Sequence, residues 1–422
     1  MPVASSARLR RARWATTLMF FTNGALFANL LPRYPSIKEA AGLSNTGFGL
    51  LVIAFPLGAI LAGLASAALI RRIGAGNLAA LTTALVAAGL IVVGWSTSIP
   101  LLAVALLVAG AMDAITDVAQ NSHGLWVQRG YGRTLINSFH ATWSAGAVTG
   151  GAMGTFAAAR DLPLGWHLTV SGIVWVLIAL VARALSLSRS LTSPAEVDRS
   201  RLEAEPAGAA AEHPDAARAD SAHDNSAGGR TLKRSAWVLA ALVMVAAAGT
   251  LVEDSGNTWS AVFLRSELGA SAALAGAGYV ALTGAQFIGR LVGDPLSDRL
   301  GQRAVARIGA VLIVAGMLAV VFSPAAGFAI AGFAVAGYGS ATLVPAAMQA
   351  ADALPGHREG SALSLVSWLM RLAFLASPPI VGALGDAAGL RVGLAVVPVL
   401  ALFAIAAAGQ LTGRERNRAQ PI

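Results

Sequence analysis

The chain has 422 residues, of which 56% are hydrophobic and only 12% are charged. That charged fraction is about half that of an ordinary soluble domain, and a soluble fold cannot bury so much apolar surface. Cysteine is absent, which excludes disulfides, thiolate metal sites and cysteine nucleophiles. The composition therefore indicates an integral membrane protein.

The formal net charge of +9 does not indicate nucleic-acid binding, because the basic residues form short clusters at the ends of apolar segments. The sequence also lacks HExxH, nucleophile-elbow and Walker motifs. We therefore expect no enzyme activity, no metal site and no cofactor.

Apolar segments long enough to cross a bilayer, at about 20 residues each, occur in two groups of six. Lipid offers no hydrogen-bond partner to the backbone, so each segment must be a helix. The sequence predicts an all-α membrane protein with 12 transmembrane helices in two pseudo-symmetric six-helix bundles, residues 1–187 and 235–422. The expected helices are 14–32, 45–69, 77–95, 100–127, 134–158, 164–187, 235–263, 270–297, 304–322, 325–353, 359–384 and 389–411.

A polar stretch, residues 188–234, separates the two groups. It mixes both charge signs and lacks aromatic residues, so we expect a disordered linker. Arg and Lys cluster on the same side as this linker and both termini, which predicts that all three are cytoplasmic in a bacterial-type inner membrane.

Short motifs recur in the two halves. Residues 71–74 read Arg-Arg-Ile-Gly and residues 298–301 read Asp-Arg-Leu-Gly, so Arg72 superposes on Arg299 at an offset of 227 residues. The same offset aligns the Gly-Leu-Ser of 42–44 with the Gly-Ala-Ser of 269–271. Parallel repeats of this kind are typical of one class of secondary transporters.

These two loops resemble the signature of the major facilitator superfamily, with a degenerate first copy and a better second copy, Asp298-Arg299-x-Gly301-x-Arg303. Asn29 to Pro32, and Asp117 followed four positions later by Asn121, resemble the fucose/proton symporter-like branch. The run 139–146 resembles uncharacterised bacterial inner-membrane permeases of that branch. The resemblance implies a central cavity, alternating access and a coupled proton carried by Asp117.

Asp113 and Asp117 share one face of the fourth segment, about 20 and 26 Å into the membrane at 1.5 Å per residue. A carboxylate at that depth favours its neutral form and can load and release a proton, so both are candidate coupling residues. The alternative is a structural role, with one of them paired to Arg371.

Arg371 is expected near the midplane, where it must face the cavity or a carboxylate. Its guanidinium can bind a substrate carboxylate, phosphate or hydroxyls, or pair internally with Asp117 or Glu253. Glu253 and Asp254 are adjacent and point about 100° apart, so we expect one to face the cavity and the other an extracellular gate. If their helix ends early, both lie on a solvated rim.

Uncharged polar residues in the segments can supply hydrogen bonds to a solute, although each alone is commonly a contact between helices. These candidate substrate-binding residues are Asn23, Asn29, Asn121, His140, Trp143, Asn257, Gln286 and Gln349. His140 can relay protons or simply pack as a neutral ring.

Arg290 and Asp294 are four residues apart and are expected to form an ion pair at the inner gate, close to Arg72, Asp298 and Arg299. In the fifth segment, the Gly146-x-x-x-Gly150-x-x-x-Gly154 pattern should allow a neighbouring backbone to approach closely.

The pattern as a whole predicts a monomeric secondary transporter that takes up a small polar solute, sugar-like in character, together with protons. Sodium coupling stays open, because carboxylates and amides also bind hard cations. The alternatives are proton-coupled export of a metabolite or drug and, more remotely, a non-transporting membrane sensor. In the superfamily that the chain resembles, exporters carry a Gly-Pro step among the glycines of the fifth segment. Here Gly151 follows Gly150, and the resemblance therefore argues against export.

Overall fold

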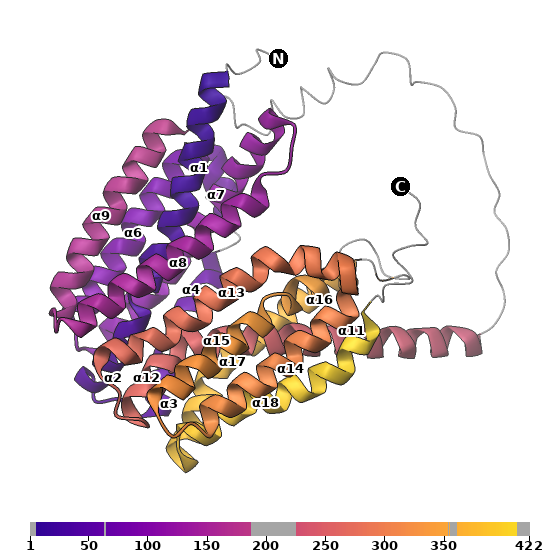
Figure 1. Ribbon diagram of the computed structural model, residues 1–422. Coiled ribbons are helices and arrows are strands. Elements are labelled where there is room, and N and C mark those ends of the chain that lie inside the picture. The colour runs from indigo at the N-terminus through magenta and orange to yellow at the C-terminus, as the bar shows by residue number, and fades with distance from the viewer. Residues whose placement is uncertain (1–5, 63–64, 187–224, 353, 355–360, 412–422) are drawn as a thin grey trace, which may run out of the picture.

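The structure, a computed structural model, describes residues 6–62, 65–186, 225–352, 354 and 361–411; the side chains of residues 6, 225–236, 294 and 361 lie outside that description. Every regular element in this part of the chain is a helix. The helices form two bundles that correspond to the two halves of the sequence (Figure 1).

The first bundle packs α1 against α8 and α9, α6 between α7 and α9, and α4 against α7. A short turn and helix, η1 (Leu31–Arg33) and α2 (Tyr34–Ala40), connect α1 to α3. The bundle contains α1 (Ser6–Ala28), α3 (Asn45–Val52), α4 (Ala54–Ala62), α5 (Ser66–Ile73), α6 (Ala75–Trp95), α7 (Ile99–Tyr131), α8 (Ile136–Ala159) and α9 (Leu164–Leu185).

The second bundle packs α15 against α13 and α14, and α17 against α11 and α18. It contains α11 (Asn225–Asp254), the π-helical turn η4 (Ser255–Trp259), α12 (Ser260–Ser266), α13 (Ala272–Leu300), α14 (Gln302–Val321), α15 (Ala326–Ser340), α16 (Leu343–Asp352), α17 (Ser361–Ala388), α18 (Leu390–Ala407) and η5 (Ala408–Gln410).

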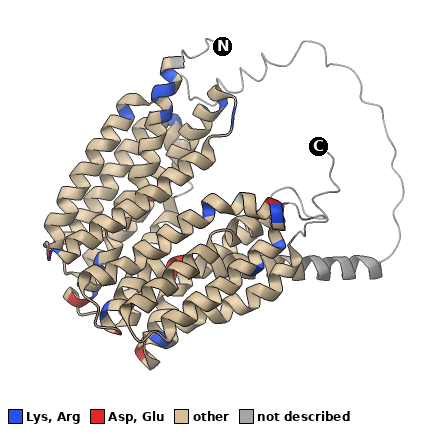
Figure 2. Ribbon diagram, viewed as in Figure 1, with Lys and Arg blue, Asp and Glu red and all other residues tan. Residues whose placement is uncertain are grey.

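Consecutive elements combine into twelve transmembrane helices. Ten of the described segments are long and apolar enough to cross a membrane by themselves. The other two, α1 and α8, carry more polar side chains. Lys, Arg, Asp and Glu lie mainly at helix ends (Figure 2), as a bilayer requires.

The expected linker boundary at residue 234 needs correction, because α11 already begins at Asn225. No proline interrupts residues 225–236, so the helix continues beyond its apolar part. Residues 187–224 of the expected linker lie outside the described residues.

The backbone confirms the predicted repeat. Gly42 and Gly269 have φ of 62° and 59°, and Gly74 and Gly301 have φ of 82° and 85°. Ser44 and Ser271 each cap the following helix by accepting a hydrogen bond from the backbone N–H three residues later. All three pairs are 227 residues apart, so equivalent turns connect equivalent helices in the two bundles.

Glycines allow α1 and α8 to pack with their backbones in contact. A Cβ atom on Gly146, Gly150 or Gly154 would collide with a backbone carbonyl of α1, at Phe21, Ala25 and Asn29 respectively. The predicted role of this small-residue pattern is confirmed.

The two bundles meet through α8 with α13 and through α3 with α17. The closest approach lies at the end of the molecule that carries α2, the start of α3 and α12, which we call the contact end (Figure 1). There Asp386 Oδ1 and Oδ2 accept hydrogen bonds from Asn45 N and Thr46 N, both at 2.8 Å. Toward the opposite end, where α1 begins and α18 ends, the ribbons diverge; we call this the terminal end.

The backbone contact between α1 and α8 predicts a large cost for Gly150→Val. Overpacking there should destabilise the protein by about 1–3 kcal/mol, which thermal unfolding of the purified protein measures. Gly284→Val is the matched control, because no heavy atom outside its own helix segment lies within 4 Å of the Cβ position at Gly284. Equal melting temperatures for the two variants would contradict this packing.

Asp386 acts as a helix cap supplied from the other bundle. Asp386→Ala should therefore shift the contact end toward an open arrangement by about 1 kcal/mol, or about fivefold in population. The distance between spin labels at two exposed positions, Ala40→Cys on α2 and Ala388→Cys on α17, reports this change. The exposed Asp352 provides the control variant, Asp352→Ala. An unchanged distance distribution for Asp386→Ala would show that the cap does not hold the bundles together.

Candidate functional site

A buried hydrogen-bond network connects α1, α7 and α8 in the middle of the first bundle. Asn23, only 8% exposed, donates through Nδ2 to Asp113 Oδ1 at 2.8 Å. Its Oδ1 accepts from Trp143 Nε1 at 2.9 Å and from Gln120 Nε2 at 3.2 Å. The amide of Asn23 therefore fixes one carboxyl and one indole at the same point.

Asp117 lies one turn along α7 from Asp113 and repels it electrostatically. Its Oδ1 accepts hydrogen bonds from Gln120 Nε2 at 3.1 Å and from Asn121 Nδ2 at 3.0 Å. The network thus joins both carboxyl groups through Gln120 and Asn23.

Asp117 and Arg371 lie within membrane-spanning helices, and His140 lies near the start of α8, yet all three are exposed. The carboxyl group of Asp117 interacts electrostatically with both His140 and Arg371. Arg371 belongs to the second bundle and the other two to the first. The electrostatic interaction between Asp117 and Arg371 therefore crosses the interface between the bundles.

The second bundle supplies a facing ion pair. Arg290 Nη2 lies 3.6 Å from Glu253 Oε2, with side chains 38% and 32% exposed. Gln286 Nε2 donates to the same Glu253 oxygen at 3.2 Å and to Ser340 Oγ at 3.3 Å. Arg290 also reaches the first bundle, where its Nη1 donates to Ser144 Oγ at 3.4 Å.

Together these residues form what we call the central cluster: Asn23, Asp113, Asp117, Gln120, Asn121, His140, Trp143 and Ser144 from the first bundle, and Glu253, Gln286, Arg290, Ser340 and Arg371 from the second. It presents three carboxyl groups, two guanidinium groups and one indole edge. Among the described residues, no group of three or more His, Asp or Glu side chains is arranged to hold a metal ion.

Arg290 lies elsewhere than the sequence predicted. We expected it to pair with Asp294 at a gate, but its described ion pair is with Glu253; the side chain of Asp294 lies outside the described residues. A guanidinium within a membrane-spanning helix is stabilised by a carboxylate that faces it from another helix. Helical spacing along one segment does not predict such a partner. The other expected gate residues, Arg72, Asp298 and Arg299, are exposed at the terminal end.

Three candidate ligands lie outside the central cluster. Gln349 accepts a hydrogen bond from Gln302 Nε2 at 2.7 Å, on the exposed surface of the second bundle. Asn29 Oδ1 is 2.7 Å from His167 Nε2 and is buried at the contact end. Asn257 is half-buried in the π-helical turn η4.

Gln120 and Ser144 belong to the cluster but were not predicted. Each has a sequence signal, because Gln120 lies three residues after Asp117 and Ser144 lies four after His140, so each shares a helix face with a candidate. A small hydroxyl and a lone amide are too common in transmembrane helices for that signal to single them out.

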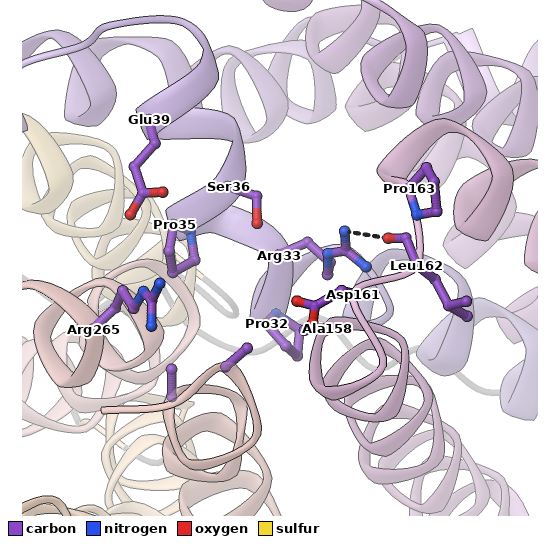
Figure 3. A pocket seen from close by; sticks show the side chains of 12 residues that line it. Pro32, Arg33, Pro35, Ser36, Glu39, Ala158, Asp161, Leu162, Pro163 and Arg265 are labelled. Atoms are coloured by element: carbon purple, nitrogen blue, oxygen red, sulfur yellow. Dashed lines mark hydrogen bonds between the residues drawn. The ribbon is translucent and has the colours of Figure 1, made fainter. Parts of the chain in front are cut away.

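A separate cavity of about 250 Å³ opens at the contact end, between η1, α2, the α8–α9 connection, α12 and α13 (Figure 3). Arg33, 5% exposed, lies on its wall and donates from Nη2 to Leu162 O at 2.8 Å. Burial lowers the pKa of Arg33, and the charge of Asp161 opposes that effect. This cavity lies on the closed side of the bundle contact and is not part of the central cluster.

The network around Asn23 predicts that removal of the Asn23 amide destabilises the protein more than removal of the Asn121 amide. Asn23→Ala leaves the Asp113 carboxyl and the Trp143 and Gln120 donors without this partner and should cost about 1–3 kcal/mol. Asn121→Ala removes an amide whose described bonds all go to Asp117, one turn away on the same helix, and it should cost less. Thermal unfolding of both variants tests this order, and a reversed order would contradict the network.

Comparison with known proteins supports the architecture. A sequence model of the Major Facilitator Superfamily matches residues 16–262 and 253–421. An uncharacterised transporter of Sinorhizobium fredii is 28% identical over 382 residues, covering 90% of this chain and 93% of the relative. An uncharacterised MFS-type transporter of Yersinia pestis is 27% identical over 403 residues, covering 94% and 95%.

Solved structures with the same fold have low sequence identity. The inward-facing, occupied form of a bacterial homologue of the human lysosomal transporter Spinster matches with a TM-score of 0.72 at 14% identity, covering 99% of this chain and 100% of that one. The nucleoside transporter NupG matches with a TM-score of 0.67 at 11% identity, covering 94% and 97%. A D-xylose-proton symporter matches with a TM-score of 0.66 at 16% identity, also covering 94% and 97%.

Proposed function

The chain belongs to the Major Facilitator Superfamily, and from that premise we propose that it takes up a small polar solute by alternating access, coupled to inward movement of protons. The observation that carries the proposal is the central cluster itself. Its charged groups come from both bundles and meet where the bundles face each other, so a rocking motion of one bundle against the other changes their partners.

Asp117 is the group best placed to carry the coupled proton. Its hydrogen-bond donors in the first bundle are amides, which bind either protonation state. Its attraction to His140 and Arg371, by contrast, exists only when the carboxylate is ionised. Movement of α17 relative to α7 therefore changes the affinity of Asp117 for a proton. Asp113 repels an ionised Asp117, so loading one site favours ionisation of the other.

The solute would bind between the bundles. Arg371 and the Arg290–Glu253 pair can bind hydroxyl, carboxylate or phosphate oxygens, and Gln286 supplies an amide. The Trp143 ring can cover an apolar edge of a sugar-like ring, since its indole N–H is already held by Asn23. The D-xylose symporter and the nucleoside transporter share this fold, which agrees with a polar solute but does not identify one.

The described arrangement corresponds to a transporter that is closed at the contact end. With both termini in the cytoplasm of a bacterial inner membrane, the contact end faces outward and the protein is inward-facing. Arg72, Asp298 and Arg299 would then act at the inner gate when the terminal ends approach each other. We propose a monomer as the working unit, because both halves of the cluster come from one chain.

Export by exchange with protons is the second candidate, since a transport cycle based on the same cluster can operate in either direction. Uptake is favoured because the described ion pairs and amides suit a polar, uncharged or anionic solute better than an amphipathic cation. Counterflow in liposomes separates the two: transport restricted to amphipathic cations would favour export.

Asp117→Asn should abolish proton-driven accumulation of the solute and leave solute exchange within about twofold of wild type. The reason is that an amide keeps the shape and hydrogen bonds of the neutral acid but cannot release a proton. Candidate solutes first come from a thermal-shift screen of the purified protein, because a bound ligand raises the melting temperature. Both activities are then measured in proteoliposomes.

Asp161→Asn, at an exposed position outside the cluster, serves as the control. Equal loss of accumulation and exchange in Asp117→Asn would assign Asp117 a structural role. Accumulation driven by a sodium gradient at constant pH would show that sodium, and not the proton, is the coupling ion.

A further inference from the structure

A second carboxyl group, Asp254, is buried directly after Glu253 of the central cluster, on the side of the contact end. Asp254 ends α11 directly before the π-helical turn and is 1% exposed. Its Oδ1 accepts a hydrogen bond from Thr258 Oγ1 at 3.1 Å. The Ser377 hydroxyl of α17 faces the carboxyl group, but within the described residues neither Ser377 Oγ nor Asp254 Oδ2 has a hydrogen bond of standard geometry.

No cation compensates this carboxyl group among the described side chains that act on it. The interacting groups are Ser377 and Thr258, which are uncharged, and the adjacent Glu253, which repels it. The titratable group that faces it from the first bundle is Tyr34 of α2, on which Asp254 and Tyr279 of α13 both act. The groups that interact with Asp254 in this way are therefore neutral or acidic.

The π-helical turn that follows Asp254 takes part in an inter-bundle contact. Tyr34 and Phe48 of the first bundle stack edge-to-face at 5.2 Å, and Phe48 packs edge-to-face against Trp259 of the second bundle at 5.8 Å. Phe48 and Trp259 are fully buried. If the bundles separate at the contact end, Tyr34 and Phe48 move away with the first bundle and water reaches the turn that carries Asp254.

An ionised carboxylate without a cation costs several kcal/mol to bury, whereas the neutral acid needs only hydrogen bonds. The closed contact end therefore accommodates neutral Asp254, and the open one accommodates the ionised form. We propose that Asp254 is a second proton-binding site, and that closure of the contact end takes up one proton there. The proposal rests on the surroundings of Asp254 and does not depend on the role of Asp117.

The sign of the effect follows from linkage. Because the closed arrangement binds one more proton than the open one, acid favours closure and alkali favours opening, by up to tenfold in population per pH unit. Asp386, which accepts hydrogen bonds across this interface, has the opposite sign, since protonation would remove an acceptor from the start of α3. The direction of the pH response therefore distinguishes the two residues.

The test uses spin labels at Ala40→Cys and Ala388→Cys in the full chain, which has no native cysteine, reconstituted in lipid nanodiscs. Pulsed electron–electron double resonance measures the distance between the two labels at values between about pH 5 and pH 9. It gives the fraction of molecules with the short distance of the closed arrangement. We expect this fraction to fall as the pH rises in the otherwise native chain. With Asp254→Asn it should stay high at every pH, because the amide cannot ionise.

Asp352→Asn is the matched control and should keep the native pH response. Asp254→Ser is a second variant that also cannot ionise, for use if the amide does not fold. An otherwise native chain that does not open as the pH rises would overturn the proposal without any variant, as would a native response in Asp254→Asn. So would closure that follows sodium concentration at constant pH, since Asp254 would then bind a cation.

The outcome for Asp117→Asn separates this proposal from the proposed function. If that variant loses the pH response and Asp254→Asn keeps it, proton-dependent closure belongs to the central cluster. The inference about Asp254 then fails while the transport proposal stands. If Asp254→Asn alone loses the response, the proton taken up on closure binds at Asp254 and not at Asp117.

Discussion

A charged or unpaired polar group inside a bilayer has to find its partner within the protein, and the rest of this structure depends on that constraint. The charged residues of the central cluster lie within membrane-spanning helices, and each interacts with a group on another helix. Arg290 is paired with Glu253 and reaches Ser144 across the bundle interface. Asp117 and Arg371 interact from opposite bundles. The charges therefore mark the surface along which the two halves of the chain face each other.

The helix packing around this surface is built from small residues and repeated turns. Gly146, Gly150 and Gly154 bring α8 into backbone contact with α1, which holds Asn23 beside Asp113 and Trp143. Equivalent glycines and serine caps at an offset of 227 residues give both bundles the same loops. The two bundles contact each other through α3 with α17 and α8 with α13. Alternating access requires that one bundle rocks against the other.

The sequence predicted what depends on local periodicity and composition. The twelve helices, the repeat offset and the glycine contact on α8 follow from spacing along one segment, and the structure confirms them. The partner of Arg290 could not be predicted, because helical spacing points to Asp294 while the described pair, Glu253, lies 37 positions earlier on α11. Gln349 was a candidate substrate-binding residue because it is polar. Its contact with Gln302 could not be predicted, since that contact depends on how α14 and α16 pack. The start of α11 at Asn225 shows that a polar sequence without proline can extend a helix beyond its apolar part.

The central claim is that the cluster lies in a space reached from each membrane face in turn. Asn121, half-buried and bonded to Asp117, is the position from which to measure this. In the cysteine-free chain, Asn121→Cys can be treated with a membrane-impermeant thiol reagent from either face, with and without an imposed solute gradient. Without a solute gradient, we expect labelling only from the membrane face on which the termini lie. With a gradient that drives transport, we expect labelling from both faces. Labelling from one face under every condition, or from neither, would contradict it.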